Sequence, residues 1–350
     1  MAGGPLEGLK VVEFEGLGPG PFACMMLCNH GAEVTRIRRP GSGARVSRTD
    51  LIVGQNRNNV ELDLKDPAAI AKCIEIIAAS DALIEGFRPG VMERLGLGPG
   101  DLAAHNPRLV YGRMTGWGQS GPLANTAGHD INYIAISGAL GAIGSAERPY
   151  PPLNLVADFG GGALYLAFGV LAAVMRARET GVGAVVDCAM VDGVASLMSM
   201  MWGMRSAGMW GDTRRANLLD GGCPFYDTYS CADGQWVAVG ALEPQFYAIL
   251  LEKLQLTELA DVAQYDEKMW PRIREAIAGG FARHTRAEIC ALFEGSDGCV
   301  SPILTMGEAL DHPHMKARGI FGEGSMPVPA PAPRFAPLKP ATGKTGAKES

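Results

Sequence analysis

Apolar runs of strand length alternate with helix-length patterns through the first half of the chain. Two helices are predicted there, an apolar one over 22–30 and one over 67–79 that has Asp66 as its N-cap and Pro67 at its first position. The predicted strands cover residues 10–14, 33–38, 82–86, 108–114 and, further on, 184–188. This alternation predicts parallel strands with crossover helices, a doubly wound α/β fold whose ligands bind at loops that follow strands.

The character of the chain changes near residue 225. Before that point, Asp158 is expected to cap an apolar helix that runs to about 178, and a Met-rich helix is predicted over 191–209. We expect those methionines to be packing residues, because Met commonly fills irregular gaps in a core. Residues 227–229 and 235–240 then have the pattern of a hairpin, and the stretch after them is helical and more charged. A second, smaller domain is therefore predicted from about residue 225.

Charge and cysteine content narrow the class of protein. The chain has 350 residues, enough for two domains, and its formal net charge of -6 argues against nucleic acid as the main partner. The N-terminal residues lack the pattern of a secretory signal and the eight cysteines include no C-x-x-C pair, so we expect a cytoplasmic protein without disulfides or a metal site. The uncharged run 159–175 is expected to be a buried core helix and not a membrane span.

The first glycine turn does not fit a dinucleotide site. Residues 16–20 have the spacing G-x-G-x-G, whereas the dinucleotide fingerprint needs G-x-G-x-x-G and an acidic residue after the second strand. The second predicted strand ends instead with Arg36, Arg38 and Arg39. Guanidinium groups bind phosphate in a two-pronged fashion, so this strand end is a candidate phosphate site.

Two further polar loops support that interpretation. Residues 56–59 contain one arginine and three asparagines, and the loop after the 82–86 strand carries Arg88. Charge clusters are often no more than solvated surface, but loops that follow successive strands can converge on one polyphosphate ligand. The candidate binding residues are Gly18, Arg36, Arg39, Asn59 and Arg88.

Two polar clusters in apolar surroundings are candidates for chemistry. His129 and Asp130 form the first, although a lone histidine is usually structural. The second covers 154–162, from Asn154 through Asp158 to three glycines at 160–162. An Asp before a helix is commonly only its N-cap, yet a bare glycine backbone lets a ligand approach the amide hydrogens, which can stabilise an oxyanion such as an enolate. No G-x-S-x-G, P-loop or H-E-x-x-H motif occurs, so hydrolase and nucleotidase activities lose support.

Six segments, taken in order along the chain, resemble the class III coenzyme A-transferase family, and within it the α-methylacyl-CoA racemases. They are 16–21, 85–90, 113–122, 128–133, 158–162 and 330–335, and the likeness runs from about residue 5 to 336. The resemblance implies an α/β fold with a Rossmann-like parallel sheet in a large domain over 1–200, to which 325–350 returns. It also implies a linker over 201–224, a small α+β domain over 225–324, and an interlocked homodimer. Arg39 and Arg88 would contact the phosphates of coenzyme A.

The same resemblance implies a role for four residues of the candidate site. His129 and Asp158 match the two acid/base residues of the racemases. Glu243 matches a carboxylate that orients the histidine, and Asp130 matches a supporting neighbour. The expected partner is an acyl-CoA thioester, with no metal or redox cofactor because coenzyme A is part of the substrate, and with neither nucleic acid nor a membrane as a partner.

The expected reaction is racemisation of 2-methylacyl-CoA thioesters through an enolate, with one residue removing the α-proton and the other returning a proton to the opposite face. The alternative is acyl-CoA transfer, in which Asp158 attacks the thioester and forms a mixed anhydride. His129 separates the two reactions, because transfer has no evident need for it. A third possibility is a protein that binds CoA thioesters without turnover.

Overall fold

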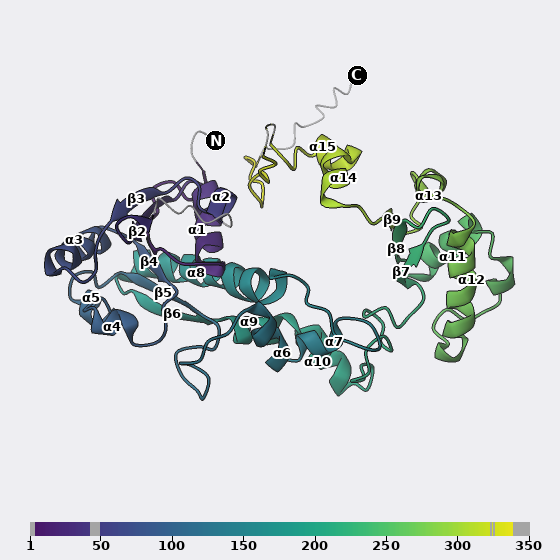
Figure 1. Cartoon of the computed structure of the whole chain (residues 1–350), viewed down its shortest axis with the longest axis horizontal. Helices are drawn as coiled ribbons and strands as arrows, with labels where there is room; N and C mark the ends of the chain where they lie inside the picture. Colours follow the sequence, from purple (N-terminus) through teal and green to yellow (C-terminus); the bar gives the residue numbers. More distant parts are fainter. Residues whose placement is uncertain (1–3, 43–49, 323, 325, 339–350) are drawn as a thin grey trace, which may run out of the picture. The chain divides into compact units, whose positions relative to one another are not determined.

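The computed structural model describes residues 4–42, 50–322, 324 and 326–338 (Figure 1). Its contacts divide the chain into two compact units: unit 1 holds 1–125, 162–189 and 328–350, and unit 2 holds 126–161 and 190–327. Residues 126–161 and 190–200, expected in the large domain, lie in unit 2 with the later part of the chain. Of the segment expected to return, 328–338 is described as part of unit 1, and 325 and 339–350 lie outside the described residues.

Unit 1 is built on a six-stranded parallel sheet. Its strand order is β3-β2-β1-β4-β5-β6, with every neighbouring pair parallel. This is the order of doubly wound nucleotide-binding folds, which confirms the predicted fold class. The strands are β1 (Lys10–Phe14), β2 (Glu33–Arg38), β3 (Asn58–Glu61), β4 (Ala82–Glu85), β5 (Val110–Thr115) and β6 (Ala184–Ala189).

Helices cover both faces of this sheet. Neighbouring residues of β5 show the two sides, since Tyr111 belongs to a core cluster shared with α3, α4 and α5, whereas Gly112 lies against Leu166 of α8. The first cover consists of α3 (Pro67–Ala78), α4 (Val91–Arg94) and α5 (Pro99–Ala103). The other contains α1 (Pro19–Asn29), with α2 (Asp50–Val53) beside it, and α8 (Tyr165–Thr180). As predicted, Asp66 caps α3 by accepting a hydrogen bond from the amide of Ala68.

The buried carboxylate of Glu13 on β1 forms ion pairs with β2 and with the segment before β3. Its Oε1 lies 3.1 Å from Nη2 of Arg36 on β2, and its Oε2 lies 2.9 Å from Nε of Arg57, which precedes β3. Glu13 is fully buried and Arg36 nearly so. The pair with Arg57 anchors the polar stretch before β3. Residues 56–59 were expected to be a loop, but from Asn58 the chain pairs with β2 as the edge strand β3, directly after the anchored Arg57.

A second buried network joins β4 to β5. Arg113 donates from Nε to Glu85 and from Nη1 and Nη2 to the carboxylate of Glu93 on α4. The other oxygen of Glu85 accepts the amide hydrogen of Phe87 at 2.7 Å. The glutamate at the start of the 85–90 motif therefore shapes the loop that follows β4.

Unit 2 contains a group of short helices and a small antiparallel sheet. The helices near its start are α6 (Asp130–Ile136), α7 (Ala139–Ala142), α9 (Met190–Leu197) and α10 (Ser199–Ser206). The single helix predicted over 191–209 is therefore divided at Met198. None of the residues of α10 is buried within the chain, so the expectation that its methionines pack into a core is wrong for this stretch.

The small sheet has the order β7-β8-β9 and its own core. Strands β7 (Tyr226–Ser230) and β8 (Trp236–Gly240) pair antiparallel, which confirms the predicted hairpin, and β9 (Val300–Pro302) pairs with β8. One face packs on a cluster that runs from Cys223 to Phe293. The helices of this part are α11 (Pro244–Lys253), α12 (Trp270–Ala282), α13 (Arg286–Phe293), α14 (Met306–Asp311) and α15 (Pro313–Ala317), with short 3₁₀ turns η3 (Thr257–Leu259) and η4 (Glu267–Met269).

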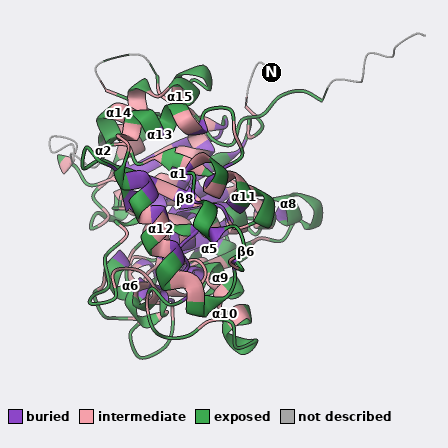
Figure 2. Ribbon diagram, turned by 90° about the vertical axis from the view of Figure 1, so that its right-hand side faces the viewer, coloured by how far each residue is buried: buried purple, intermediate pink, exposed green. Residues whose placement is uncertain are grey.

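The helix expected after Asp158 starts earlier and is wound in two ways. Residues Leu155–Leu164 form a π-helix, η2, that continues directly into α8. By length and composition alone the helix Leu155–Thr180 could cross a membrane, a test that core helices also pass. Leu166 and Val170 of α8 are fully buried, whereas Leu164, Phe168 and Met175 are exposed, and Figure 2 shows the exposed class along the visible part of α8.

Glu13 gives a direct test of how unit 1 is held together. Glu13→Gln should lower the free energy of unfolding by about 3–5 kcal/mol, because it leaves Arg36 and Arg57 buried without a counter-charge. Urea unfolding monitored by circular dichroism measures this loss. The control is Glu75→Gln, whose pair with Lys72 is exposed and should change stability by less than about 1 kcal/mol. Equal effects of the two substitutions would contradict the structural role of Glu13.

Candidate active site

The first turn of α6 fixes the backbone on either side of His129. The amide of His129 donates to Oδ1 of Asn132 at 3.0 Å, and the hydroxyl of Tyr133 donates to the carbonyl oxygen of Gly128. His129 is the N-cap residue of α6, but its imidazole makes no capping hydrogen bond and is exposed. The main chain at 128–129 is therefore held while the ring is left available.

Asp130 connects α6 to the π-helix. Its carboxylate is buried, and Oδ2 accepts hydrogen bonds from the amides of Ala157 at 2.7 Å and Asp158 at 2.8 Å. Charge-assisted hydrogen bonds of this kind are stronger than neutral ones. The residue that follows His129 thus sets the position of the backbone that carries Asp158.

Asp158 lies within η2, so the expectation that it is an N-cap is wrong. Its side chain is half-buried, and Oδ2 accepts a hydrogen bond from Nδ2 of Asn154 at 3.2 Å. Burial raises the pKa of the Asp158 carboxyl above its ordinary value, and the nearby carboxylate of Asp130 raises it further. The hydrogen bond from Asn154 and the charge of His129 act in the opposite direction. The group is thus shifted toward the range in which a carboxyl can both give and take a proton.

The structure brings His129 and Asp158 into one neighbourhood of unit 2. The two groups are close enough for His129 to influence the titration of Asp158. Among the described residues no hydrogen bond or ion pair joins the two side chains. An imidazole and a carboxyl near each other but not in contact is the arrangement that proton transfer on two faces of one carbon requires.

Gly161, the middle one of the three glycines after Asp158, serves packing, which corrects part of the sequence interpretation. A Cβ atom on Gly193 of α9 would lie 1.9 Å from the carbonyl oxygen of Gly161, so these two helices meet backbone to backbone. The amides of Ala157 and Asp158 are already bound to Asp130. The expected oxyanion site at the helix start beside Asp158 is therefore not available at those two amides.

Glu243 lies elsewhere in unit 2, at the N-terminus of α11. It is the N-cap residue, yet its exposed side chain makes no capping hydrogen bond. Among the described residues, no hydrogen bond or ion pair joins Glu243 to His129. The chain by itself does not bring the predicted orienting carboxylate to the histidine.

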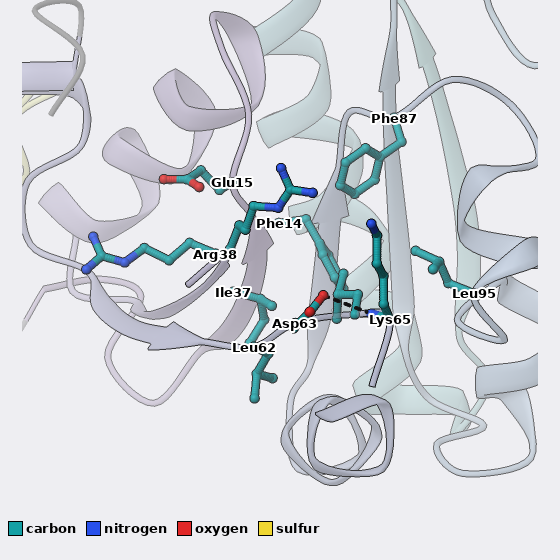
Figure 3. A pocket seen from close by; sticks show the side chains of 11 residues that line it. Phe14, Glu15, Ile37, Arg38, Leu62, Asp63, Lys65, Phe87 and Leu95 are labelled. Carbon is teal, nitrogen blue, oxygen red and sulfur yellow. Dashed lines mark hydrogen bonds between the residues drawn. The ribbon is translucent and has the colours of Figure 1, made fainter. Parts of the chain in front are cut away.

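A hollow lined by three cationic and two acidic side chains, among apolar ones, opens in unit 1 where β1, β2, β3 and β4 end. Its volume is about 320 Å³, and Figure 3 shows the side chains of Arg38, Lys65, Phe14 and Phe87 around it. Arg38 is paired with Glu61 at 3.0 Å, whereas Arg39 and Lys65 are exposed. The complete lining is Phe14, Glu15, Ile37, Arg38, Arg39, Leu62, Asp63, Leu64, Lys65, Phe87 and Leu95. Cationic groups beside an apolar wall at this edge of a doubly wound sheet suit a phosphate-bearing ligand with an aromatic base.

The other predicted binding residues have different surroundings. Arg36 is turned into the core and pairs with Glu13, so the expectation that it contacts phosphate is wrong. Asn59 is exposed on β3, not in a loop, and Arg88 is exposed after β4 but does not line the hollow. Gly18 precedes α1 with a φ of 73°, a left-handed conformation that glycine adopts at little cost.

Two residues of these sites, Lys65 and Asn154, are not among the predicted site residues. Lys65 follows β3, which the sequence pattern does not predict as a strand, so its place at the carboxyl edge of the sheet becomes clear only in the structure. The short run Val60-Glu61-Leu62 is the local signal for that strand. Asn154 lies four residues before Asp158, just ahead of η2, and its contact depends on a helix start that the sequence does not predict.

The fold defines the chain as a doubly wound α/β protein with a hollow at the sheet edge in one unit and an imidazole and carboxyl pair in the other. The chain belongs to CoA-transferase family III, whose model matches residues 6–346. This confirms the family indicated by the sequence motifs.

Among curated relatives, the α-methylacyl-CoA racemase of Homo sapiens is 47% identical over 333 residues, covering 94% of this chain and 86% of the relative. The mouse α-methylacyl-CoA racemase is 46% identical over 332 residues, with the same coverage. The human succinyl-CoA:glutarate CoA-transferase is 28% identical over 363 residues, covering 96% of this chain and 81% of the relative. The chain is thus more similar to these racemases than to this transferase.

Solved structures support the fold. The protein Rv3272 of Mycobacterium tuberculosis superposes with a TM-score of 0.79 at 26% identity, covering 95% of this chain and 93% of that one. A CAIB/BAIF family protein from Brucella suis superposes with a TM-score of 0.81 at 23% identity and the same coverage, which shows the fold alone.

The environment of Asp158 predicts how a neighbour controls its titration. Asn154→Ala should raise the pKa of Asp158 further, because it removes a hydrogen bond that stabilises the charged form. Carboxyl ¹³C NMR of aspartate-labelled protein measures the change. Asn58→Ala, at an exposed position on β3, should leave the titration unchanged. A lower pKa in the Asn154 variant would show that the amide does not stabilise the carboxylate.

Proposed function

We propose that the protein is an isomerase that interconverts (R)- and (S)-2-methylacyl-CoA thioesters. One observation carries the proposal, namely that the buried carboxylate of Asp130, the residue after His129, accepts the amide of Asp158 at 2.8 Å and so holds the backbones of the two residues together. The 46–47% identity with two proteins named α-methylacyl-CoA racemase supports it.

The reaction moves one proton on and one proton off the carbon next to the thioester. One of the two residues takes the α-proton, and the C–H electron pair moves into an enolate whose charge rests on the thioester oxygen. The other residue then gives a proton to the opposite face, and the carbonyl reforms. His129 serves as the base for one enantiomer and Asp158 for the other, so the direction of the reaction decides which residue acts first.

Asp130 and Asn154 act as positioning residues in this scheme. Asp130 holds the amide of Asp158, and Asn154 holds the Asp158 carboxylate itself. Burial of the Asp158 carboxyl reduces the difference in acidity between it and the weakly acidic α-carbon, which makes proton transfer less uphill.

We further propose that the hollow at the sheet edge binds the nucleotide end of the acyl-CoA. Arg38, Arg39 and Lys65 offer charge to its phosphates, and Phe14 and Phe87 offer an apolar wall to its base. In this proposal coenzyme A is part of the substrate and the residues of the protein itself carry the proton chemistry. Arg88, exposed after β4, is retained as a further phosphate contact.

A homodimer is part of the proposal because the chain leaves two features without a partner. The exposed apolar side chains of Leu164, Phe168 and Met175 follow one side of the helix, and such a surface is typical of an interface. Glu243 exposes its carboxylate and does not meet the histidine of its own chain. We propose that an interlocked second copy covers the helix and brings Glu243 to His129 of the other protomer.

The cytoplasm is the proposed location, with neither nucleic acid nor a membrane as a partner. All eight cysteines are free thiols, as proteins of a reducing compartment usually have. The net charge of -6 is unfavourable for a phosphate backbone as a partner.

Exchange with solvent deuterium tests the two-residue scheme. His129→Ala should abolish racemisation of both enantiomers but block α-proton exchange, by about 10²-fold or more, for only one of them. Asp158→Asn should block exchange of the other enantiomer. Exchange is measured by mass spectrometry of each pure 2-methylacyl-CoA enantiomer in deuterium oxide, without any acceptor acid.

His105→Ala, at an exposed position in unit 1, is the control and should match the wild type. Equal, small losses for both enantiomers in the His129 variant would contradict the scheme. Absence of exchange in the wild type together with CoA transfer to a carboxylate would identify a transferase with Asp158 as nucleophile. Tight CoA binding with neither reaction would identify a binding protein.

A comparison of acyl-CoA with a substrate that lacks the nucleotide tests whether the hollow binds the nucleotide. Lys65→Ala should raise KM for an acyl-CoA by about tenfold with little change in kcat, because one charge-assisted contact made equally in the ground and transition states is lost. The same variant should not affect an acyl-pantetheine thioester, which lacks the nucleotide. Lys72→Ala, at an exposed position on α3, is the matched control. A similar loss with both substrates would place Lys65 outside the nucleotide site.

A further inference from the structure

In the turn between β8 and α11, two main-chain carbonyl oxygens accept hydrogen bonds from side chains and not from the backbone of the sheet or the helix. The amide of Leu242 donates back to the carbonyl oxygen of Gly240 at 3.0 Å, which closes a tight turn. The next two carbonyl oxygens, of Ala241 and Leu242, both accept hydrogen bonds from the side-chain amide of Gln264, whose Nε2 lies 3.0 Å and 2.9 Å from them. The hydroxyl of Tyr265 donates to the Leu242 oxygen as well, at 2.6 Å.

The two side chains that hold this turn are themselves fixed. Gln264 is 9% exposed, and its main-chain carbonyl oxygen accepts a hydrogen bond from Nε1 of Trp270 at 3.1 Å, whereas its side-chain Oε1 is buried without a hydrogen-bond partner among the described residues. The ring of Phe225 lies edge-on to Tyr265, with centroids 5.1 Å apart, and edge-on to Trp270 at 6.1 Å. A buried amide backed by packed aromatic rings makes a rigid support for the turn.

Glu243 is the next residue after the held carbonyls. Its main chain is extended and Pro244 follows at the first position of α11, so the backbone has little freedom on either side. Its carboxylate does not cap the helix and is exposed. Burial, then Cys223 and then the Glu243 charge raise the pKa of Tyr265, so the phenol and the carboxylate are close. The support therefore fixes the main chain from which the Glu243 side chain projects.

We propose that Gln264 and Tyr265 are positioning residues that act through Glu243, by holding the turn that presents its carboxylate to the histidine base. This inference rests on the proposed racemase function and adds a support that the acid/base pair itself does not include. Neither residue touches the reacting carbon in this assignment. Their effect is confined to the proton transfers that His129 performs.

Tyr265→Phe tests the proposal in the full-length dimer, because it deletes one hydroxyl and keeps the ring in its aromatic contacts. The expected loss is about fivefold in kcat for the enantiomer whose α-proton His129 removes, as for one neutral hydrogen bond, with KM unchanged. The other enantiomer should exchange at the wild-type rate. In a Glu243→Gln background the same substitution should cause no further loss, because it acts only through that carboxylate.

Tyr247→Phe is the matched control, since the Tyr247 hydroxyl is buried in the same core and has no hydrogen-bond partner among the described residues. It should leave both exchange rates unchanged. Gln264→Met, which removes both amide donors, should reproduce the one-sided loss more strongly, with melting temperature and circular dichroism recorded to confirm that the variant is folded. A one-sided loss in a folded Gln264→Met variant supports the proposal.

Three results would overturn it. The first is a Tyr265→Phe variant that loses the same fraction of its exchange rate for both enantiomers. The second is a double variant, Tyr265→Phe with Glu243→Gln, in which the fold-losses of the two single variants multiply. The third is a Glu243→Gln variant with wild-type exchange of both enantiomers. Failure of the racemase function itself is a separate result, because the wild-type protein would then exchange neither enantiomer.

Discussion

A single buried carboxylate oxygen holds the two parts of the candidate active site together. Oδ2 of Asp130 accepts the amides of Ala157 and Asp158, while Asp130 itself follows His129 in the first turn of α6. The backbones that carry His129 and Asp158, the residues that we assign to proton transfer, are therefore joined through this one oxygen atom of Asp130. The other oxygen of Asp130 is buried without a hydrogen-bond partner among the described residues, a cost of roughly 1–3 kcal/mol that the fold tolerates here. Such a cost is more easily understood at a functional site than at a purely structural one.

Buried carboxylates also hold neighbouring segments together in unit 1, where they fix the ends of strands. Glu13 and Glu85 lie near the carboxyl ends of two strands, and each is buried against arginines from neighbouring segments. These pairs contribute little net stability compared with apolar residues of similar size, but removing one partner is costly, so they fix the register of the loops. The exposed Arg39 and Lys65 around the hollow are thereby placed on a rigid edge. In the motifs 85–90 and 113–122, Glu85 and Arg113 are thus scaffold residues.

The sequence predicted regular elements well and the neighbourhoods of polar residues poorly. Strands such as Lys10–Phe14 and the capped helix at Pro67 depend on local pattern and local hydrogen bonds, which a single stretch of sequence contains. Arg36 appeared to be a phosphate ligand because its partner, Glu13, is 23 residues away and becomes its neighbour only through strand register. The π-helix around Asp158 also escaped prediction. Its start is set by Asp130, 27 residues before Ala157, and by the close approach of Gly161 to α9.

The separation of Glu243 from His129 bears on how the reaction and the assembly are connected. The acid/base pair that we propose, His129 and Asp158, lies within one chain, and Asp130 holds the backbone that carries Asp158. Glu243, the carboxylate that we propose to orient the histidine, is different, because it is exposed on a supported turn and its side chain has no hydrogen-bond or ion-pair partner among the described residues. A carboxylate held out on a rigid turn can orient a histidine only if the surface that carries the histidine binds against that turn. Binding of the turn by the second copy would make full activity a property of the dimer, with the histidine side of the reaction more dependent on assembly than the Asp158 side.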